Sequence, residues 1–333
     1  MTTPLNRRTA LHRMSCGAAA VLGWSAASLA KAQSTWPRQP VKVVVPFAAG
    51  GSTDVFARLL ARHFTDVVGH PFVVDNRPGA NGNLGASQVA AALPDGHTLL
   101  LSTTGPLSIN KLLYRRMPYD PVTAFTPIAL LADLPLVLAA HPSVPAKDLT
   151  QLIAWLKARP GDVSYSTAGN GSMGHLAAEL VQRATGTSMI HVPYKGSAGA
   201  LNDLIAGVVK LSFDLVPTYL QQIEAGKIRA LAVLGTRRVS TLPGVPTLLE
   251  SGIKASAVGW NGLVGPRGLP ASIVAVLNKA TNEFLASTEG RAQLQTFSMQ
   301  PIGGKPEALS AFVRSEMDKW RPIVEPLAST IMQ

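Results

Sequence analysis

The stretch that decides the fold is VKVVVPFAAGGSTDVFARLLARHF, which spans residues 41–64. Its first five residues are four valines and a lysine, a composition typical of a short buried strand. A turn with two adjacent glycines, Gly50 and Gly51, follows it. Residues 52–54, Ser-Thr-Asp, are types that favour a helix start, and apolar residues at every fourth position then give the helix a face to bury. The stretch therefore predicts a strand–turn–helix unit of an α/β protein.

The turn of this unit is predicted to bind an anion through its backbone. Gly50 and Gly51 carry no side chain, so a ligand can approach the chain closely. The helix that follows presents unpaired N–H groups and the positive end of its dipole at the same place. A Walker A loop would need a lysine after the second glycine, and Ser52 stands there. Nucleoside triphosphates are therefore not expected as ligands. The alternative to anion binding is that the turn only reverses the direction of the chain.

Residues 1–32 are predicted to be a secretory signal peptide. They contain the pair Arg7-Arg8, a weakly apolar run over residues 16–29, and Ala30-Lys31-Ala32, which resembles a cleavage site. The arginine pair leaves both the general and the twin-arginine export routes open. The apolar run is shorter than the roughly 20 residues that span a bilayer. We therefore expect a periplasmic protein and exclude this segment from the fold.

Composition narrows the function classes further. Cys16 is the only cysteine and lies within the predicted signal peptide, so no disulfide, thiol nucleophile or cysteine-based zinc site is expected. The histidines after residue 32 are scattered along the chain, which argues against a metal site. The formal net charge of +11 falls to +7 without the four basic residues of 1–32. This balance favours acidic small molecules, but no dense basic run points to nucleic acid.

Strands and helices alternate along the rest of the chain, which indicates parallel, doubly wound sheets flanked by helices. In such sheets ligands bind beyond the carboxyl ends of the strands. Small polar residues follow several predicted strands, in two sets that would face each other across a cleft. The first set is Ser52, Asn83, Thr103 and Thr104, and the second is Gly171, Ser172 and Asp214.

A long apolar segment at residues 125–141 is predicted to cross between two lobes. It contains Pro135, which an ordinary central strand would not tolerate. A second crossing is expected at residues 228–247. Two crossings imply that one lobe is inserted in the other. The predicted boundaries are 33–132 and 240–333 for lobe 1 and 133–239 for lobe 2.

One loop suggests two rival functions. Residues 169–174, GNGSMG, satisfy the dinucleotide pattern G-x-G-x-x-G between a strand and a helix. The acidic residue expected at the end of the next strand is missing, although Lys195 could suit the 2′-phosphate of NADP. An exported NADP-dependent oxidoreductase is therefore the main alternative. A hydrolase centred on Ser172 would need glycine at position 170, where asparagine stands, and His175 is expected to help cap the helix.

Four further side chains have two interpretations each. Asp54, at a helix start, is by default a capping residue, and Asp214, at a strand end, either points into the cleft or away from it. Phe47 and Tyr194, on loops, are either packing residues or walls of a ligand pocket.

Several motifs together resemble the tripartite tricarboxylate transporter substrate-binding proteins, also called the Bug family. They span almost the whole chain after residue 32 in one order. The motifs are PFAAGG at 46–51 with Asp54, NRPGA at 76–80 with Gly82 and Gly85, GNGS at 169–172 with His175, HVPYKG at 191–196 and LPGVPT at 242–247.

The resemblance implies a type II periplasmic-binding-protein fold, in which two α/β lobes close on a ligand like a Venus flytrap. It also implies that the first turn binds a ligand carboxylate, largely through backbone N–H groups. With the reading of the residues themselves, it predicts one set of binding residues. They are Phe47, Ala49, Gly50, Gly51, Ser52, Thr53, Asp54, Asn83, Thr103, Thr104, Gly171, Ser172, His175, Tyr194 and Asp214.

We therefore expect a monomeric, periplasmic solute-binding protein that captures a small organic carboxylate between its lobes. It would present this ligand to a membrane permease of the tripartite tricarboxylate type, or to a sensor protein. No catalytic residue, cofactor or metal is expected.

Overall fold

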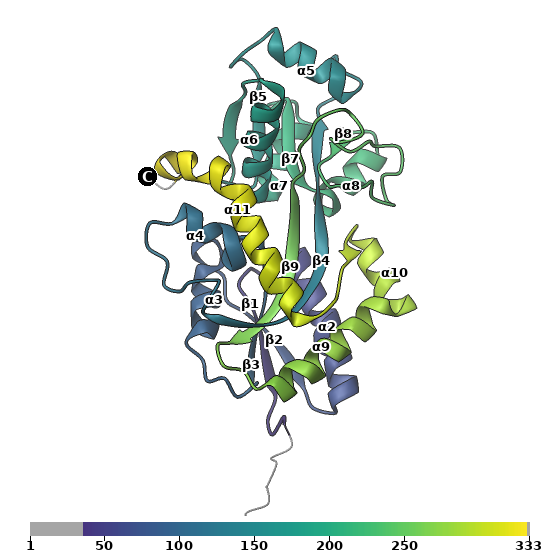
Figure 1. Cartoon of the computed structure of the whole chain (residues 1–333). Coiled ribbons are helices and arrows are strands. Elements are labelled where there is room, and N and C mark those ends of the chain that lie inside the picture. The colour runs from purple at the N-terminus through teal and green to yellow at the C-terminus, as the bar shows by residue number, and fades with distance from the viewer. Residues whose placement is uncertain (1–35, 332–333) are drawn as a thin grey trace, which may run out of the picture. The chain divides into compact units, whose positions relative to one another are not determined.

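A computed structural model describes residues 36–331 of the chain, so the predicted signal peptide at 1–32 lies outside the described part. From Gln39 onward the chain forms one compact unit. A ten-stranded sheet runs through this unit with helices packed around it (Figure 1). This confirms the α/β fold class. No helix in the described part is both long and apolar enough to cross a membrane.

The strands are β1 (Val41–Val45), β2 (Phe72–Asn76), β3 (Thr98–Thr103), β4 (Phe125–Ala140), β5 (Ser164–Thr167), β6 (Ile190–Pro193), β7 (Leu211–Leu215), β8 (Arg229–Val233), β9 (Val258–Pro266) and β10 (Gln300–Pro301). The helices are α2 (Ser52–Val68), α3 (Asn83–Ala90), α4 (Asn110–Leu113), α5 (Leu149–Lys157), α6 (Met173–Thr185), α7 (Ser197–Ile205), α8 (Val216–Glu224), α9 (Ala271–Ala286), α10 (Thr288–Thr296) and α11 (Pro306–Ile331). Two irregular turns, Ala80–Gly82 and Gly105–Ile109, precede α3 and α4.

The sheet has two parallel halves, as the alternation of strands and helices predicts. β1 pairs in parallel with β2 and β3, and β5 pairs in parallel with β6 and β7. The strands between these halves are antiparallel, because β9 pairs with β3 and with β4, and β4 pairs with β7 and β8. The sheet as a whole is therefore mixed rather than parallel.

β4 joins the two halves of the sheet. Its residues up to Pro135 pair with β9, and from Leu136 onward it pairs with β7 and β8 (Figure 1). Pro135 thus stands where the strand exchanges one partner for another. A proline has no N–H to donate to a ladder, so this exchange point is a position that tolerates it.

The return to the first half overlaps the predicted crossing at residues 228–247 but extends beyond it and does not include β8. β8 still pairs with the far end of β4, opposite residues 137–140. The chain returns through residues 234–257 and enters β9 at Val258, whose partner on β4 is Pro135. Four of the five residues of β8, RALAV, are apolar, and such a strand looks the same in sequence whether it stays in one half or crosses.

The first strand–turn–helix unit forms as predicted. All four valines of β1 and the apolar stripe of α2, Phe56, Leu60 and Phe64, are almost fully buried. Phe64 also packs against Phe72 of β2, with ring centroids 5.1 Å apart. This burial fixes the start of α2 at the carboxyl end of β1, where the turn becomes part of the site.

Candidate functional site

A cavity of about 310 Å³ lies where the first turn approaches the second half of the sheet. Its wall contains the β1–α2 turn, the end of β3, the middle of β4, the start of α6 and the end of β7. These segments come from both parallel halves of the sheet. The cavity is therefore built at the carboxyl ends of strands, where α/β sheets bind ligands.

The β1–α2 turn supplies an uncapped helix start. Gly51 is the N-cap of α2 in an extended conformation, with φ of −75°, and no side chain caps the first turn. The first N–H groups of the helix have no partner within the helix itself. Gly50 has φ of +87°, a conformation that glycine adopts without steric cost. The glycine pair thus folds the chain back while leaving these N–H groups accessible.

Asp54 holds the turn in shape. Its side chain is 3% exposed, and Oδ2 accepts the N–H of Gly50 at 2.9 Å and Nε–H of Arg58 at 3.0 Å. Oδ1 accepts from Nδ2 of Asn76 at 2.9 Å. Burial acts to raise the pKa of Asp54, but the hydrogen bonds from Arg58, Gly50 and Asn76 outweigh it and hold the pKa below its usual value. The carboxylate is therefore ionised and already partnered at neutral pH.

A second helix start lies on the opposite side of the cavity. Ser172 is the N-cap of α6, and its hydroxyl accepts the N–H of His175 at 3.3 Å. Gly174 packs so closely on β7 that a Cβ there would lie 2.1 Å from the carbonyl oxygen of Phe213. Glycine at this position is therefore required for the start of α6 to reach the end of β7.

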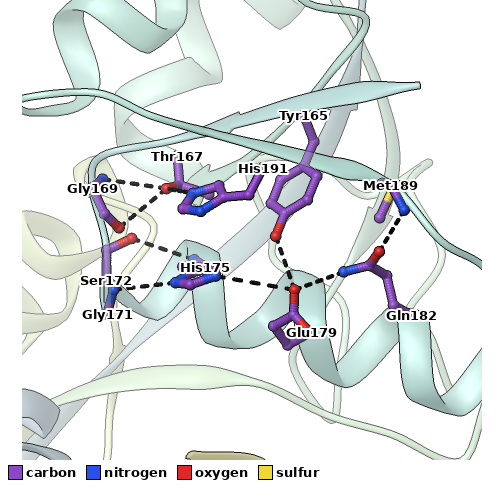
Figure 2. A network of polar contacts seen from close by, with 10 residues as sticks. All are labelled: Tyr165, Thr167, Gly169, Gly171, Ser172, His175, Glu179, Gln182, Met189 and His191. Carbon is purple, nitrogen blue, oxygen red and sulfur yellow. Dashed lines mark hydrogen bonds and ion pairs between the residues drawn. The ribbon is translucent and has the colours of Figure 1, made fainter. Parts of the chain in front are cut away.

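Two stacked histidines lie behind this helix start (Figure 2). The rings of His175 and His191 are 3.9 Å apart between centroids and inclined by 14°. Nδ1 of His175 accepts the N–H of Gly171 at 3.2 Å, and Nε2 of His191 lies 2.7 Å from Oγ1 of Thr167. Burial lowers the pKa of His175 to about 4, and burial together with the charge of His175 lowers the pKa of His191 to about 3. Both rings are therefore neutral at pH 7 and support the loop.

Asp214 differs from Asp54 in having a free oxygen. It is 6% exposed at the end of β7, and Oδ1 accepts the N–H of Leu215 at 2.7 Å. Oδ2 has no hydrogen-bond partner of normal geometry among the described residues. Burial raises the pKa of Asp214, while the Ser197 hydroxyl and the Leu215 amide act in the opposite direction.

The structure brings nine of the predicted binding residues to the wall of the cavity, and six lie outside it. Those in the wall are Phe47, Gly51, Ser52, Thr53, Asp54, Thr103, Thr104, Ser172 and Asp214. Those outside the lining are Ala49, Gly50, Asn83, Gly171, His175 and Tyr194.

The polar groups among the six are engaged elsewhere. Oδ1 of Asn83 accepts hydrogen bonds from Asn110 at 2.7 Å and from the Tyr119 hydroxyl at 3.2 Å. The hydroxyl of Tyr194 donates to Asp203. The ring of His175 holds the loop behind Ser172, so it acts on the cavity only through that loop, as the capping role predicts.

Sequence reasoning missed the apolar part of the wall. Leu134 and Leu136 of β4, Phe213 and Leu215 of β7, and Met173 of α6 line the cavity. Leu134 and Leu136 are two positions apart on one strand, so they share a face of the sheet. The segment reads as a long apolar run in the sequence, and nothing in it distinguishes a face that borders a cavity from one that borders the core.

No lysine, arginine or histidine belongs to the cavity lining within residues 36–331. In the same part of the chain, no group of three or more histidine, cysteine or acidic residues is arranged to hold a metal ion. An anionic ligand in the cavity would therefore be bound by N–H groups of helix starts and by the hydroxyls of Thr53, Thr103 and Ser172.

The rival enzyme sites find little support in this geometry. The ring of His175 accepts from Gly171 instead of contacting the Ser172 hydroxyl, so no serine–histidine pair is formed. Lys195, which would have to meet the 2′-phosphate of NADP, is exposed and outside the lining.

Comparison with known proteins identifies the relatives of the chain. The profile described as "Tripartite tricarboxylate transporter family receptor" matches residues 56–328. Protein BugT of Bordetella pertussis is 39% identical over 295 residues, which cover 87% of this chain and 90% of BugT.

Two solved structures show the same fold. R. palustris Rpa4515 with adipate has a TM-score of 0.80 at 39% identity and covers 88% of this chain and 98% of its own. MatC from Rhodopseudomonas palustris with bound malate has a TM-score of 0.76 at 33% identity, over 87% of this chain and 100% of its own.

Proposed function

The chain belongs to the tripartite tricarboxylate transporter receptor family, and on that premise we propose that it binds one small organic carboxylate in the cavity described above. It does so in the periplasm and presents the ligand to a permease of the tripartite tricarboxylate type or to a sensor protein. No chemical step takes place. The protein works as a monomer.

One observation carries the proposal. The starts of α2 and α6, two helices of 17 and 13 residues, border one cavity that has no cationic side chain in its described lining. Each start offers unpaired N–H groups and the positive end of a helix dipole. A carboxylate is the small anion that such a site can hold without a lysine or arginine. The adipate and malate of the two similar structures belong to the same chemical class.

Binding would be coupled to closure of two lobes. We assign residues 33–132 and 240–333 to one lobe and 133–239 to the other, with β4 and β9 as the hinge strands. A ligand that contacts α2 and α6 together touches both lobes. It would therefore favour the closed state, which a permease could distinguish from the open one.

Thermal unfolding against a panel of acids tests this function. The protein is first unfolded and refolded to remove any ligand carried through purification. The panel contains mono-, di- and tricarboxylates, amino acids and NADP. A true ligand at one hundred times its dissociation constant should stabilise the fold by about 2.7 kcal/mol through mass action.

The control variant is Gly51→Val. At Gly51 the φ value is ordinary and a Cβ would meet only one atom, at 3.8 Å, so the fold should tolerate the change. The valine should nevertheless obstruct the helix start and remove the response to the acid. A response to NADP with silence for every acid would refute the receptor function and favour the oxidoreductase.

A further inference from the structure

Asp214 is the one acidic side chain in the described lining of the cavity that retains an unused oxygen. It is 6% exposed, and its Oδ2 has no hydrogen-bond partner of normal geometry within residues 36–331. The other acidic side chain in that lining, Asp54, uses both oxygens on Gly50, Arg58 and Asn76. A buried carboxylate oxygen without a hydrogen-bond partner costs free energy, which a ligand that donates to it would offset.

Burial raises the pKa of Asp214, and two neighbouring donors offset this only in part, so a cation beside Oδ2 would be needed to stabilise the ionised form fully. The Leu215 amide, immediately before α8, donates to Oδ1 at 2.7 Å, and Ser197 at the first position of α7 lies beside it in the cavity wall. Partial charges at helix starts support an anion here. The described lining contains no lysine, arginine or histidine that could supply a full positive charge. Arg58 already forms an ion pair with Asp54.

When Asp214 is ionised, a ligand that carries only carboxylates would bring a second negative charge next to it. Two like charges in a partly desolvated cavity repel, and such repulsion is a strong means of rejecting a wrong ligand. A ligand with an ammonium group would instead donate to Oδ2 and balance the charge. Its carboxylate would remain free for the helix starts of α2 and α6.

We propose that the cavity selects carboxylates that carry an ammonium group, with the ammonium bound by Asp214 Oδ2 and the carboxylate bound by the helix starts. This inference rests on the proposed function, because it names the substrate class of the same site. Leu134, Leu136 and Phe213 line the same cavity and would contact the hydrocarbon part of such a ligand.

Matched ligands test the inference by isothermal titration calorimetry on the refolded protein. One series is glutamate, 2-hydroxyglutarate and 2-methylglutarate, which differ only in the group on carbon 2. A parallel series of four- and six-carbon diacids covers other lengths, and 5-aminopentanoate with pentanoate covers an ammonium at the far end. The amino member of at least one series should bind ten-fold or more tightly than its methyl or unsubstituted partner.

Asp214→Asn should reduce the affinity for the amino ligand by ten-fold or more and should strengthen the binding of its plain partner, because the repelling charge is removed. Asp162→Asn removes the same charge at an exposed position outside the cavity and should leave both affinities unchanged. Circular dichroism checks that each variant folds. If Asp214→Asn does not fold, the ligand series on the parent protein still decides the preference for the ammonium group.

The outcomes separate the two levels of the proposal. Equal or tighter binding of the plain acids would refute the ammonium preference and keep the receptor function. An amino preference that survives Asp214→Asn would refute the role of Asp214. Silence for both classes of acid would refute the receptor function and the inference with it.

Discussion

At the level of single residues, Asp54 and Asp214 show how one cavity can use the same side chain in two ways. Asp54 accepts three hydrogen bonds and holds the turn, whereas Asp214 keeps one oxygen without a partner. The sequence indicates only that Asp54 lies at a helix start and Asp214 at a strand end. The difference comes from Asn76 and Arg58, which reach Asp54 from the next strand and the next turn of α2.

We expect Asp54→Asn to destabilise the fold, because the carboxylate of Asp54 accepts three hydrogen bonds. An amide cannot accept from Gly50, Arg58 and Asn76 together, so at least one of these half-buried hydrogen bonds is lost. We expect the free energy of unfolding to fall by about 1–3 kcal/mol. Urea unfolding measures it, and Asp66→Asn, on an exposed position of the same helix, should change it by less than about 0.5 kcal/mol. Equal stability of the two variants would contradict this role.

Substitution of each of the two glycines of the turn is expected to affect stability differently. Gly50→Ala places a Cβ on a residue with φ of +87°, which costs roughly 1 kcal/mol of stability. Gly51→Ala introduces no such strain, because its φ is −75°. We expect urea unfolding to detect the first change and not the second. A stable Gly50→Ala variant would mean that the turn adopts another conformation in solution.

At the level of secondary-structure elements, the stacked histidines behind α6 predict a pH dependence of stability. Above pH 6.5 both rings are neutral in the folded and unfolded states, so they contribute no difference. Below it the unfolded histidines take up protons, whereas the folded rings, with pKa values of about 4 and 3, do not. The free energy of unfolding therefore falls as the pH drops from 6.5 to 4, by up to about 1.4 kcal/mol per pH unit for each ring.

A variant separates the contribution of the two histidines to the pH dependence from that of other titrating groups. Burial raises the pKa of Asp133 to about 6, which adds stability as the pH drops through the same range. His191→Phe keeps an aromatic ring on His175 but removes one titrating group, so the contribution of the two histidines to the pH slope should fall by about half. His70→Gln, outside the network, is the control. Urea unfolding at several pH values gives the slopes, and identical slopes for His191→Phe and the parent would contradict the prediction.

Hydrogen bonds to Glu316 attach α11 to the sheet. It is 5% exposed, and its Oε2 accepts the indole N–H groups of Trp260 on β9 at 3.3 Å and of Trp320 at 3.0 Å. Glu316→Ala leaves both buried donors without this partner, which should lower the free energy of unfolding by about 2–4 kcal/mol. Glu325→Ala, at an exposed site on the same helix, should have little effect. Tryptophan fluorescence during urea unfolding compares the two variants.

The sequence predicts individual elements better than their pairing. Regular apolar spacing is enough to predict α2, and Pro135 marks β4 as an unusual strand. The antiparallel pairing of β9 with β3 and β4 could not be predicted, because it depends on contacts between residues more than 120 positions apart. The same holds for the return between the two halves, which lies at residues 234–257.

At the level of the whole molecule, the polar half of the cavity was predictable and the apolar half was not. Ser52, Thr103 and Ser172 follow strands, where a sheet of this class places ligand-binding residues, and all three line the cavity. Leu136 and Phe213 are apolar residues of the kind that any buried strand contains. Only the assembled sheet shows that they border a hollow.

The bound structure of the protein tests the central claim most directly. The refolded protein is crystallised with the acid that stabilises it most in thermal unfolding. The account predicts a ligand carboxylate at hydrogen-bond distance, about 2.7–3.2 Å, from N–H groups of residues 52–54 and from groups at the start of α6. A ligand held outside this cavity, or within it by contacts to only one of the two helix starts, would contradict the account.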